Sequence, residues 1–165
     1  MSSAKSPALN PADLHDALQT ALIEVSENAY FVFVEPADHA QFADAVGLVK
    51  DAWLKVSVAF EGSFAGAVEI VMPEPLGMWL VTSLLGMQAH ETLEETSQFD
   101  GVGEFANMVC GAWLSKANET ASFTLDVPKV SRMPAGWAPE PAPPDQEQAY
   151  RTVVVNDLPL EVRAR

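Results

Sequence analysis

Two residues three positions apart, Glu104 and Asn107, have the clearest capacity for chemistry in this sequence. Side chains at positions i and i+3 of an α-helix are neighbours on its surface, so a helix here would display a carboxylate beside a carboxamide. The carboxylate can pair with a cation, and the carboxamide can both donate and accept hydrogen bonds. Neither group is a competent nucleophile, and no histidine or cysteine shares their arc, which argues against covalent catalysis. The pair is suited instead to orienting groups that another molecule supplies.

The helix that positions this pair is predicted to run from residue 100 to about residue 118. At about 100° per residue, one arc of the segment is apolar and must face the core; it consists of Val102, Phe105, Ala106, Val109 and Trp113. The opposite arc is polar and gathers Asp100, Glu104, Asn107, Gly111 and Asn118. Cys110 lies at the edge of the apolar arc, where a buried and inert thiol is expected. The helical phase therefore predicts that the Glu-x-x-Asn pair faces solvent.

Two glycines, Gly103 and Gly111, flank the pair although glycine destabilises a helix interior by about 0.5 to 1 kcal/mol relative to alanine. One explanation is crowding against a neighbouring element of the fold, and the other is close approach of a partner protein over bare backbone. Gly111 lies on the polar arc, where both explanations stay open. Asp100 is placed near the expected helix start, where its carboxylate would cap free backbone N–H groups. We take Asp100, Gly103 and Gly111 as the candidate partner-binding residues.

A Glu-x-x-Asn pair is common on exposed helices and identifies no function by itself. The pattern around it is more specific, because a predicted strand and then a proline follow the helix; its members are Asp100, Glu104, Asn107, Gly111 and Pro128. In this arrangement the segment DGVGEFANMVCG resembles the signature helix of the CheX/CheC/FliY family of response-regulator phosphatases. The resemblance extends to the hairpin FEGSFAGAVEIVMP and the next helix ending in LLG, and covers roughly residues 12–130 and the final strands.

Some members of that family carry a second Glu-x-x-Asn site on the first helix. The matching stretch in this chain reads Glu24, Val25, Ser26, Glu27, Asn28, so no asparagine stands three residues after a glutamate. The resemblance therefore implies a protein with one site, like CheX itself.

The resemblance implies a phosphatase that hydrolyses the phospho-aspartate of a CheY-like response regulator. In that scheme Asn107 enters the partner's active site and positions the attacking water, while Glu104 pairs with a lysine of the partner. The partner supplies the phospho-aspartate and a bound Mg²⁺, and no cofactor is expected in this chain. Two alternatives stay open: a non-catalytic response-regulator or flagellar-switch binding module that uses the same helix face, and a structural domain whose polar face is merely solvated.

Composition limits the partners and the compartment. The chain has 165 residues, 48% of them hydrophobic, which is enough for one core, and we expect a single domain over residues 1–165. A net charge of −14 repels polyphosphate backbones and anionic bilayers, so neither nucleic acid nor a membrane is expected as a partner. The sequence shows no signal peptide or membrane span, and its single cysteine cannot form an intrachain disulfide, which favours a cytoplasmic location. The histidines have no metal-ligand spacing, so no metal site is expected.

The remaining periodicities predict an α+β fold, with a mostly antiparallel sheet and two long helices packed on one face. Strand-like patterns cover residues 30–35, both sides of a hairpin turn at Glu61-Gly62, residues 120–127 and two final stretches between residues 150 and 165. Helical spacing predicts a first helix ending near residue 28 and a short helix that stops at Gly86, while residues 37–52 are ambiguous with helical character.

Two segments are expected outside this framework, a mobile N-terminus at residues 1–11 and a proline-rich loop at residues 134–148. Trp137 within the loop is a candidate contact for a partner. Exposed sheet edges would permit a homodimer, and the resemblance also implies pairing.

Overall fold

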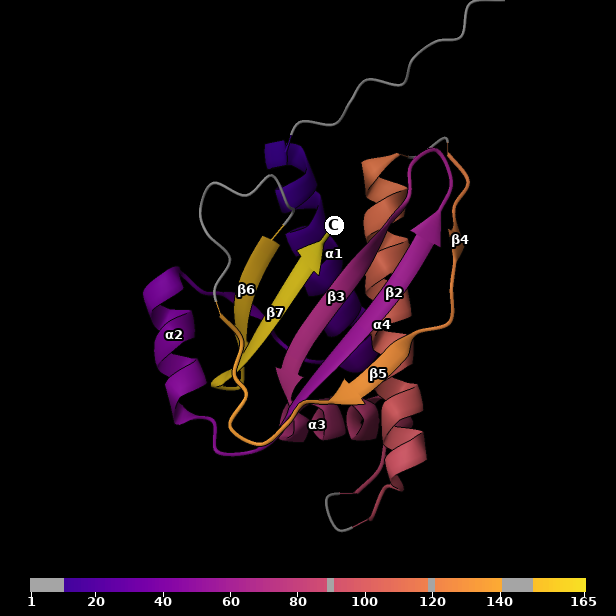
Figure 1. Ribbon diagram of the computed structural model, residues 1–165. Coiled ribbons are helices and arrows are strands. Elements are labelled where there is room, and N and C mark those ends of the chain that lie inside the picture. The colour runs from indigo at the N-terminus through magenta and orange to yellow at the C-terminus, as the bar shows by residue number, and fades with distance from the viewer. Residues whose placement is uncertain (1–10, 89–90, 119–120, 141–149) are drawn as a thin grey trace, which may run out of the picture.

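The computed structural model describes residues 11–88, 91–118, 121–140 and 150–165. Its elements, in chain order, are α1 (Pro11–Tyr30), β1 (Glu35–Pro36), α2 (His39–Leu48), β2 (Trp53–Glu61), β3 (Gly66–Pro73), α3 (Glu74–Leu85), α4 (Glu95–Ala117), β4 (Thr124–Leu125), β5 (Lys129–Arg132), β6 (Tyr150–Val155) and β7 (Leu158–Ala164). Figure 1 shows the sheet in front, with α1 and α4 behind it. The described chain therefore has the α+β class that the sequence predicts.

One antiparallel sheet of seven strands runs through the described residues, in the order β1-β6-β7-β3-β2-β4, with β5 also paired to β2. Its centre is the β2–β3 hairpin, in which the paired residues of β2 run from Trp53 to Phe60. Alternate side chains of β2 are buried in one core with the helices; they are Leu54, Val56, Val58 and Phe60. This period of two is the reason that the hairpin and its turn after Glu61 are predicted correctly.

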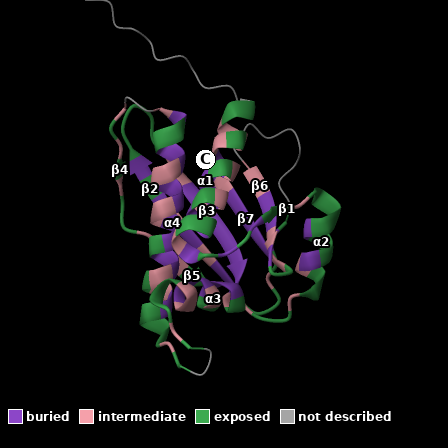
Figure 2. Cartoon of the chain, turned by 180° about the vertical axis from the view of Figure 1, so that it is seen from behind, coloured by how far each residue is buried: buried purple, intermediate pink, exposed green. Residues whose placement is uncertain are grey.

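Helices α1 and α4 lie side by side on one face of the sheet, as predicted. Tyr30 at the end of α1 meets Phe105 of α4 edge-on, with the ring centroids 5.0 Å apart. The indole N–H of Trp113 donates a hydrogen bond to the Leu14 carbonyl oxygen at 3.3 Å. Seen from the helix side, the central strands are mostly buried and the outer surfaces of both helices are exposed (Figure 2). These contacts direct the polar arc of α4 away from the sheet.

Helix α4 begins at Glu95, earlier than the predicted start at residue 100. Contacts with distant segments hold the extra turn in place. The buried Gln98 amide donates to the Glu74 carbonyl oxygen at 3.5 Å, and Glu95 pairs with Arg132 at 3.2 Å. Asp100 consequently lies in the second turn, and the prediction that it caps the helix start is wrong.

The predicted strand at residues 30–35 is wrong except at its last residue. Tyr30 ends α1, and only Glu35–Pro36 pair with β6. Phe31 has a φ of 54°, in the left-handed region, where the chain turns out of the helix. Burial still alternates along this unpaired segment: Val32 and Val34 are buried, whereas Phe31 and Phe33 are exposed. That alternation is the strand-like signal in the sequence.

Two other stretches are clarified by the structure. The ambiguous segment contains α2, which starts with a capping box between Asp38 and Gln41. The predicted strand at residues 120–127 is reduced to the two residues of β4, with residue 120 outside the described part, and β5 is not predicted. The short helix α3 ends where Gly86 adopts a φ of 62°, as the sequence predicts.

The ends and the loop are only partly described. Residues 1–10 and 141–148 lie outside the described residues, so the predictions of a mobile N-terminus and of a single domain over the whole chain stay predictions. Residues 134–140 contain no helix or strand, and Trp137 packs edge-on against Trp53 with ring centroids 6.3 Å apart. Within the described residues, no helix is long and apolar enough to cross a bilayer.

Candidate functional site

The polar face of α4 carries the predicted pair in the predicted phase. Glu104 is exposed and Asn107 is half-buried. All members of the predicted apolar arc are buried on the opposite side of the helix; they are Val102, Phe105, Ala106, Val109 and Trp113. The 3.6-residue period therefore predicted the position of both side chains relative to the core correctly.

Two adjoining hollows open at this pair, between α4 and the segment that links β4 to β5. The first has a volume of about 300 Å³ and is lined by Phe99, Asp100, Gly103, Glu104, Asn107, Val127, Pro128 and Val130. The second is lined by Glu104, Asn107, Met108, Leu125, Asp126, Val127 and Pro128. Four residues belong to both hollows: Glu104, Asn107, Val127 and Pro128. The candidate site thus has two walls, one helical and one formed by the β4–β5 segment.

The two glycines that flank the pair, Gly103 and Gly111, have different surroundings. A Cβ atom added to the buried Gly103 would lie 3.2 Å from Pro128 Cβ, which is tighter than ordinary van der Waals contact. Glycine at position 103 therefore lets the β4–β5 segment approach the helix, so packing within the fold accounts for it. A Cβ atom at Gly111 would meet no described atom within 4 Å, so the fold itself does not require that glycine.

Two hydrogen bonds and a proline fix the backbone of the β4–β5 segment. The Asp126 backbone N–H donates to the Ala59 carbonyl oxygen of β2 at 2.8 Å. The Val127 backbone N–H donates to Asp126 Oδ1 at 2.7 Å, and Pro128 restricts the next φ angle. Sequence reasoning identified Pro128 but not Val127 or Asp126. The signal available in the sequence was the turn chemistry of an aspartate two residues before a proline.

The Asn107 carboxamide is the group in this site with an unmet hydrogen-bonding requirement. Its Oδ1 atom is buried and has no hydrogen-bond partner among the described residues. A buried, unpaired acceptor typically destabilises a folded protein by about 1 to 3 kcal/mol, and such atoms are rare in native structures. An unpaired atom of this kind in a native structure calls for an explanation, and a functional role for Asn107 is one.

Two titratable groups behind the pair are held neutral. Burial, with a further contribution from the charge of Glu104, raises the pKa of Tyr30 to about 12. Its hydroxyl lies 3.9 Å from Met108 Sδ, so it supports the helix from the side of α1. Burial also raises the pKa of the Cys110 thiol to about 12, which leaves it without nucleophilic thiolate at neutral pH. The neutral Cys110 thiol is therefore not an activated nucleophile at this site.

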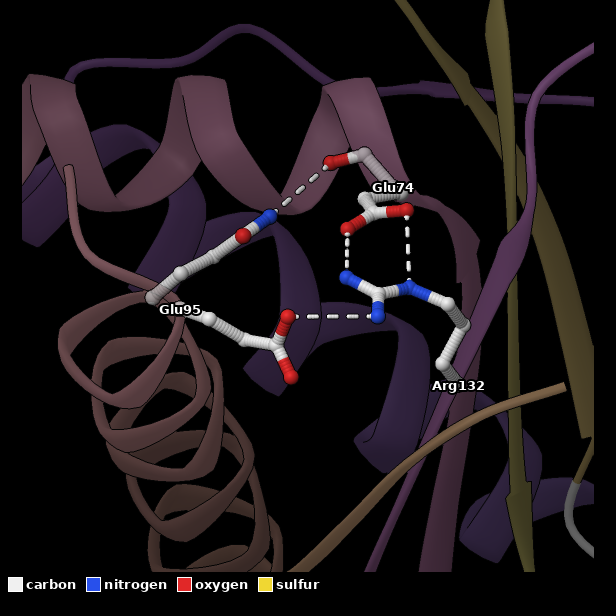
Figure 3. A network of polar contacts seen from close by, with 4 residues as sticks. Glu74, Glu95 and Arg132 are labelled. Carbon is white, nitrogen blue, oxygen red and sulfur yellow. Dashed lines mark hydrogen bonds and ion pairs between the residues drawn. The ribbon is translucent and has the colours of Figure 1, made fainter. Parts of the chain in front are cut away.

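A charged cluster fixes the start of α4 against β5 (Figure 3). The Arg132 guanidinium makes two hydrogen bonds to the Glu74 carboxylate, one of them at 3.1 Å, and one to Glu95 Oε2 at 3.2 Å. The same guanidinium lies over the Phe99 ring, 5.7 Å from its centroid. Since Phe99 lines the first hollow, this cluster ties one end of the site to the N-termini of α3 and α4. Nothing in the local sequence pattern indicated it.

The described residues contain no group of three or more His, Cys, Asp or Glu side chains that could hold a metal ion. His90 lies outside those residues. Asn107 can form hydrogen bonds and Glu104 can pair with a positive charge.

The antiparallel sheet backed by two long helices matches the α+β fold of CheX and CheC-like proteins. The chemotaxis protein CheX from Vibrio vulnificus is 15% identical, with a TM-score of 0.65 over 95% of this chain and 98% of that one. CheX from Desulfovibrio desulfuricans is 16% identical, with a TM-score of 0.67 over 93% of this chain and 98% of that one. The CheX of the CheX–CheY–BeF₃–Mg²⁺ complex from Borrelia burgdorferi is 13% identical, with a TM-score of 0.57 over 90% and 94%.

The sequence model of the chemotaxis phosphatase CheX matches residues 55–135, which include the whole motif from Asp100 to Pro128. The match of this model, together with the fold shared with CheX proteins, supports the CheX/CheC/FliY family that the sequence of the long helix resembles. No curated protein gives a sequence match.

Proposed function

We propose that this chain is a phosphatase that hydrolyses the phospho-aspartate of a CheY-like response regulator. The observation that carries the proposal is the placement of Glu104 and Asn107 together at the mouth of two hollows, with the Asn107 Oδ1 atom unpaired. The match to the family model of the chemotaxis phosphatase CheX supports the same reaction. A Borrelia CheX of this fold has been crystallised with CheY, BeF₃ and Mg²⁺, which supports a response regulator as the partner class.

The proposed reaction is an in-line displacement at phosphorus. A water oxygen bonds to phosphorus, the bond from phosphorus to the aspartate oxygen breaks, and the products are inorganic phosphate and a free aspartate carboxylate. Most of the catalytic effect in such transfers comes from positioning and charge stabilisation. A lysine and a Mg²⁺ ion on the partner would stabilise the phosphoryl charge, so the metal is assigned to the regulator and not to this chain.

The two residues of this chain would then have separate roles. Asn107 would hold the attacking water, because its carboxamide can accept a hydrogen bond from water and donate one to the phosphoryl group. Placing one water in line is worth about a hundredfold in rate, or about 2.7 kcal/mol. Glu104 would pair with the partner's lysine and set the orientation of docking. Asp100 and Gly111, which line or flank the same face, remain candidate partner-binding residues.

The direct test is the decay of a phosphorylated, Mg²⁺-loaded regulator with and without this protein. We expect the protein to accelerate decay in proportion to its concentration until the regulator is saturated. Asn28→Ala supplies a matched control, because Asn28 is an exposed asparagine on α1 outside the motif. Tight binding of a beryllofluoride-loaded regulator without faster decay would instead identify a non-catalytic binding module. Absence of both binding and acceleration would indicate a solvated structural face.

A further inference from the structure

We infer that Val127 is the apolar docking contact that seats the response regulator over Glu104 and Asn107. The inference rests on the proposed function, and it goes further by naming the surface that recognises the partner and the kind of partner surface that fits it. Val127 lines both hollows at the pair, so a molecule that occupies either hollow can contact this side chain.

Val127 combines an exposed apolar side chain with a backbone that is fixed by its neighbours. The fraction of its surface exposed is 76%, although it is a large hydrophobic residue. Its backbone is held on both sides, by the Asp126 hydrogen bonds before it and by Pro128, which packs on Gly103, after it. A β-branched side chain on a fixed backbone loses little conformational freedom when a partner covers it. Such a residue can contribute apolar burial to binding with a small entropic penalty.

The surroundings of Val127 extend this apolar contact beside the polar pair. Half-buried apolar side chains line both walls of the hollows: Phe99 and Met108 on α4, and Leu125 and Val130 on the strands that flank Val127. Val127 is the most exposed member of this set of apolar side chains, the apolar strip, which borders Asn107. A partner surface that matches it contains an apolar depression next to the phosphorylated aspartate.

The charges around the strip define the rest of that partner surface. The ionisable residues lining the two hollows are all acidic: Asp100, Glu104 and Asp126. The nearby Arg132 adds little free positive charge, because it is paired with Glu74 and Glu95. Charge complementarity thus selects a partner whose apolar depression is bordered by basic side chains. A response regulator with lysine or arginine beside its phosphorylation site fits this description, and an acidic border would be repelled.

The test uses three variants of Val127 and one matched control. Val127→Thr keeps the shape and replaces a methyl with a hydroxyl, Val127→Ala removes apolar area, and Val127→Ile keeps the apolar contact. Leu48→Ala is the control, because Leu48 is 77% exposed on α2, which packs against β6 and β7. Binding of the beryllofluoride-loaded regulator is titrated at several salt concentrations, and dephosphorylation is measured on the phosphorylated regulator.

We expect Val127→Thr and Val127→Ala to raise the Kd and the KM by about fivefold or more, the amount expected when one or two methyl groups lose apolar contact. The Val127→Ile and Leu48→Ala variants should bind like the parent protein. The loss should appear in KM and not in kcat at saturating regulator. Since Val127 is uncharged, the salt dependence of Kd should have the same slope in Val127→Thr as in the parent, which separates its contribution from that of the acidic residues.

The outcomes distinguish this inference from the proposed function. If the parent protein accelerates dephosphorylation and Val127→Thr has the same Kd and KM as the parent, the proposed function stands and Val127 is not the docking contact. Equal weakening by Val127→Ala and Leu48→Ala would also refute it, since the effect would then not be local. If the parent protein neither binds nor dephosphorylates any regulator, both proposals fall.

Discussion

Gly103 and Gly111, the glycines of helix α4 that flank Glu104 and Asn107, offer a sharp test of how the site is built, because the same substitution should have opposite effects at the two positions. Glycine to alanine in a helix interior stabilises by about 0.5 to 1 kcal/mol when the new methyl group meets nothing. Position 111 satisfies that condition, since a Cβ atom there has no described neighbour within 4 Å. We expect Gly111→Ala to raise the free energy of unfolding by about that amount.

Position 103 does not have room for an added methyl group without a shift of its neighbours. The alanine Cβ would lie 3.2 Å from Pro128 Cβ and 3.5 Å from its Cγ, so one wall must move by a few tenths of an ångström. The proline is part of a turn that is hydrogen-bonded to β2, so it cannot move alone. Overpacking of this kind destabilises by about 1 to 3 kcal/mol, which outweighs the gain in helix propensity. Gly103→Ala should therefore be less stable than Gly111→Ala by at least about 1 kcal/mol.

Urea unfolding followed by circular dichroism measures both free energies, and the phosphatase assay measures the consequence for the site. One kcal/mol corresponds to about 2 to 4 °C in Tm for a chain of this length, so thermal unfolding gives a second readout. Gly103→Ala should also lose activity, because Val127 and Pro128 would be displaced from Asn107. If Gly103→Ala is as stable as Gly111→Ala and fully active, the contact with Pro128 does not set the spacing of the two walls.

Two further predictions concern single groups. Cys110 should stay unreactive toward a thiol reagent at pH 8 while the protein is folded and should react once it is unfolded, and rapid modification of the folded protein would show that the thiol is accessible. Because burial raises the pKa of this thiol from 9.0 to about 12, the stability that the neutral thiol contributes should be lost as the pH rises from about 9 to 12. Glu104→Ala should raise the KM for the regulator by a factor that shrinks as salt is added, with kcat little changed; a loss confined to kcat would mean that Glu104 takes part in the chemical step and does not act in docking.

The parts of the fold that the sequence predicted are those dictated by local periodicity. The phase of α4 followed from the apolar arc around Phe105, and the hairpin followed from alternation on both sides of its turn. The strand prediction for the segment after Tyr30 failed because its burial alternates as in a strand although most of it pairs with no other strand. Phe31, with its positive φ, turns the chain away from the end of α1. A period of two shows that one side is buried; it does not show that a partner strand is present.

The site could be predicted only on its helical side. Spacing along one helix placed Glu104 beside Asn107, but the second wall comes from a segment about twenty residues later whose approach depends on Gly103 and Pro128 meeting in space. The earlier start of α4 has the same explanation, since Arg132 on β5 stabilises a turn that has weak helix signals of its own. Long-range packing also decides which glycine is needed for the fold, which residue type alone does not reveal.

The measurement that tests the central claim most directly is the rate of phosphate release from a phosphorylated regulator, with either Asn107→Ala or the parent protein added at a concentration that saturates the regulator. The substitution removes an acceptor of the half-buried Asn107 that has no partner in the described structure, so the free energy of unfolding should be unchanged or slightly higher. The Kd for the beryllofluoride-loaded regulator should stay within about twofold, while the rate of phosphate release should fall about a hundredfold, or about 2.7 kcal/mol in barrier height. Phosphate release by Asn107→Ala at the parental rate, with binding intact, would show that Asn107 does not position the attacking water.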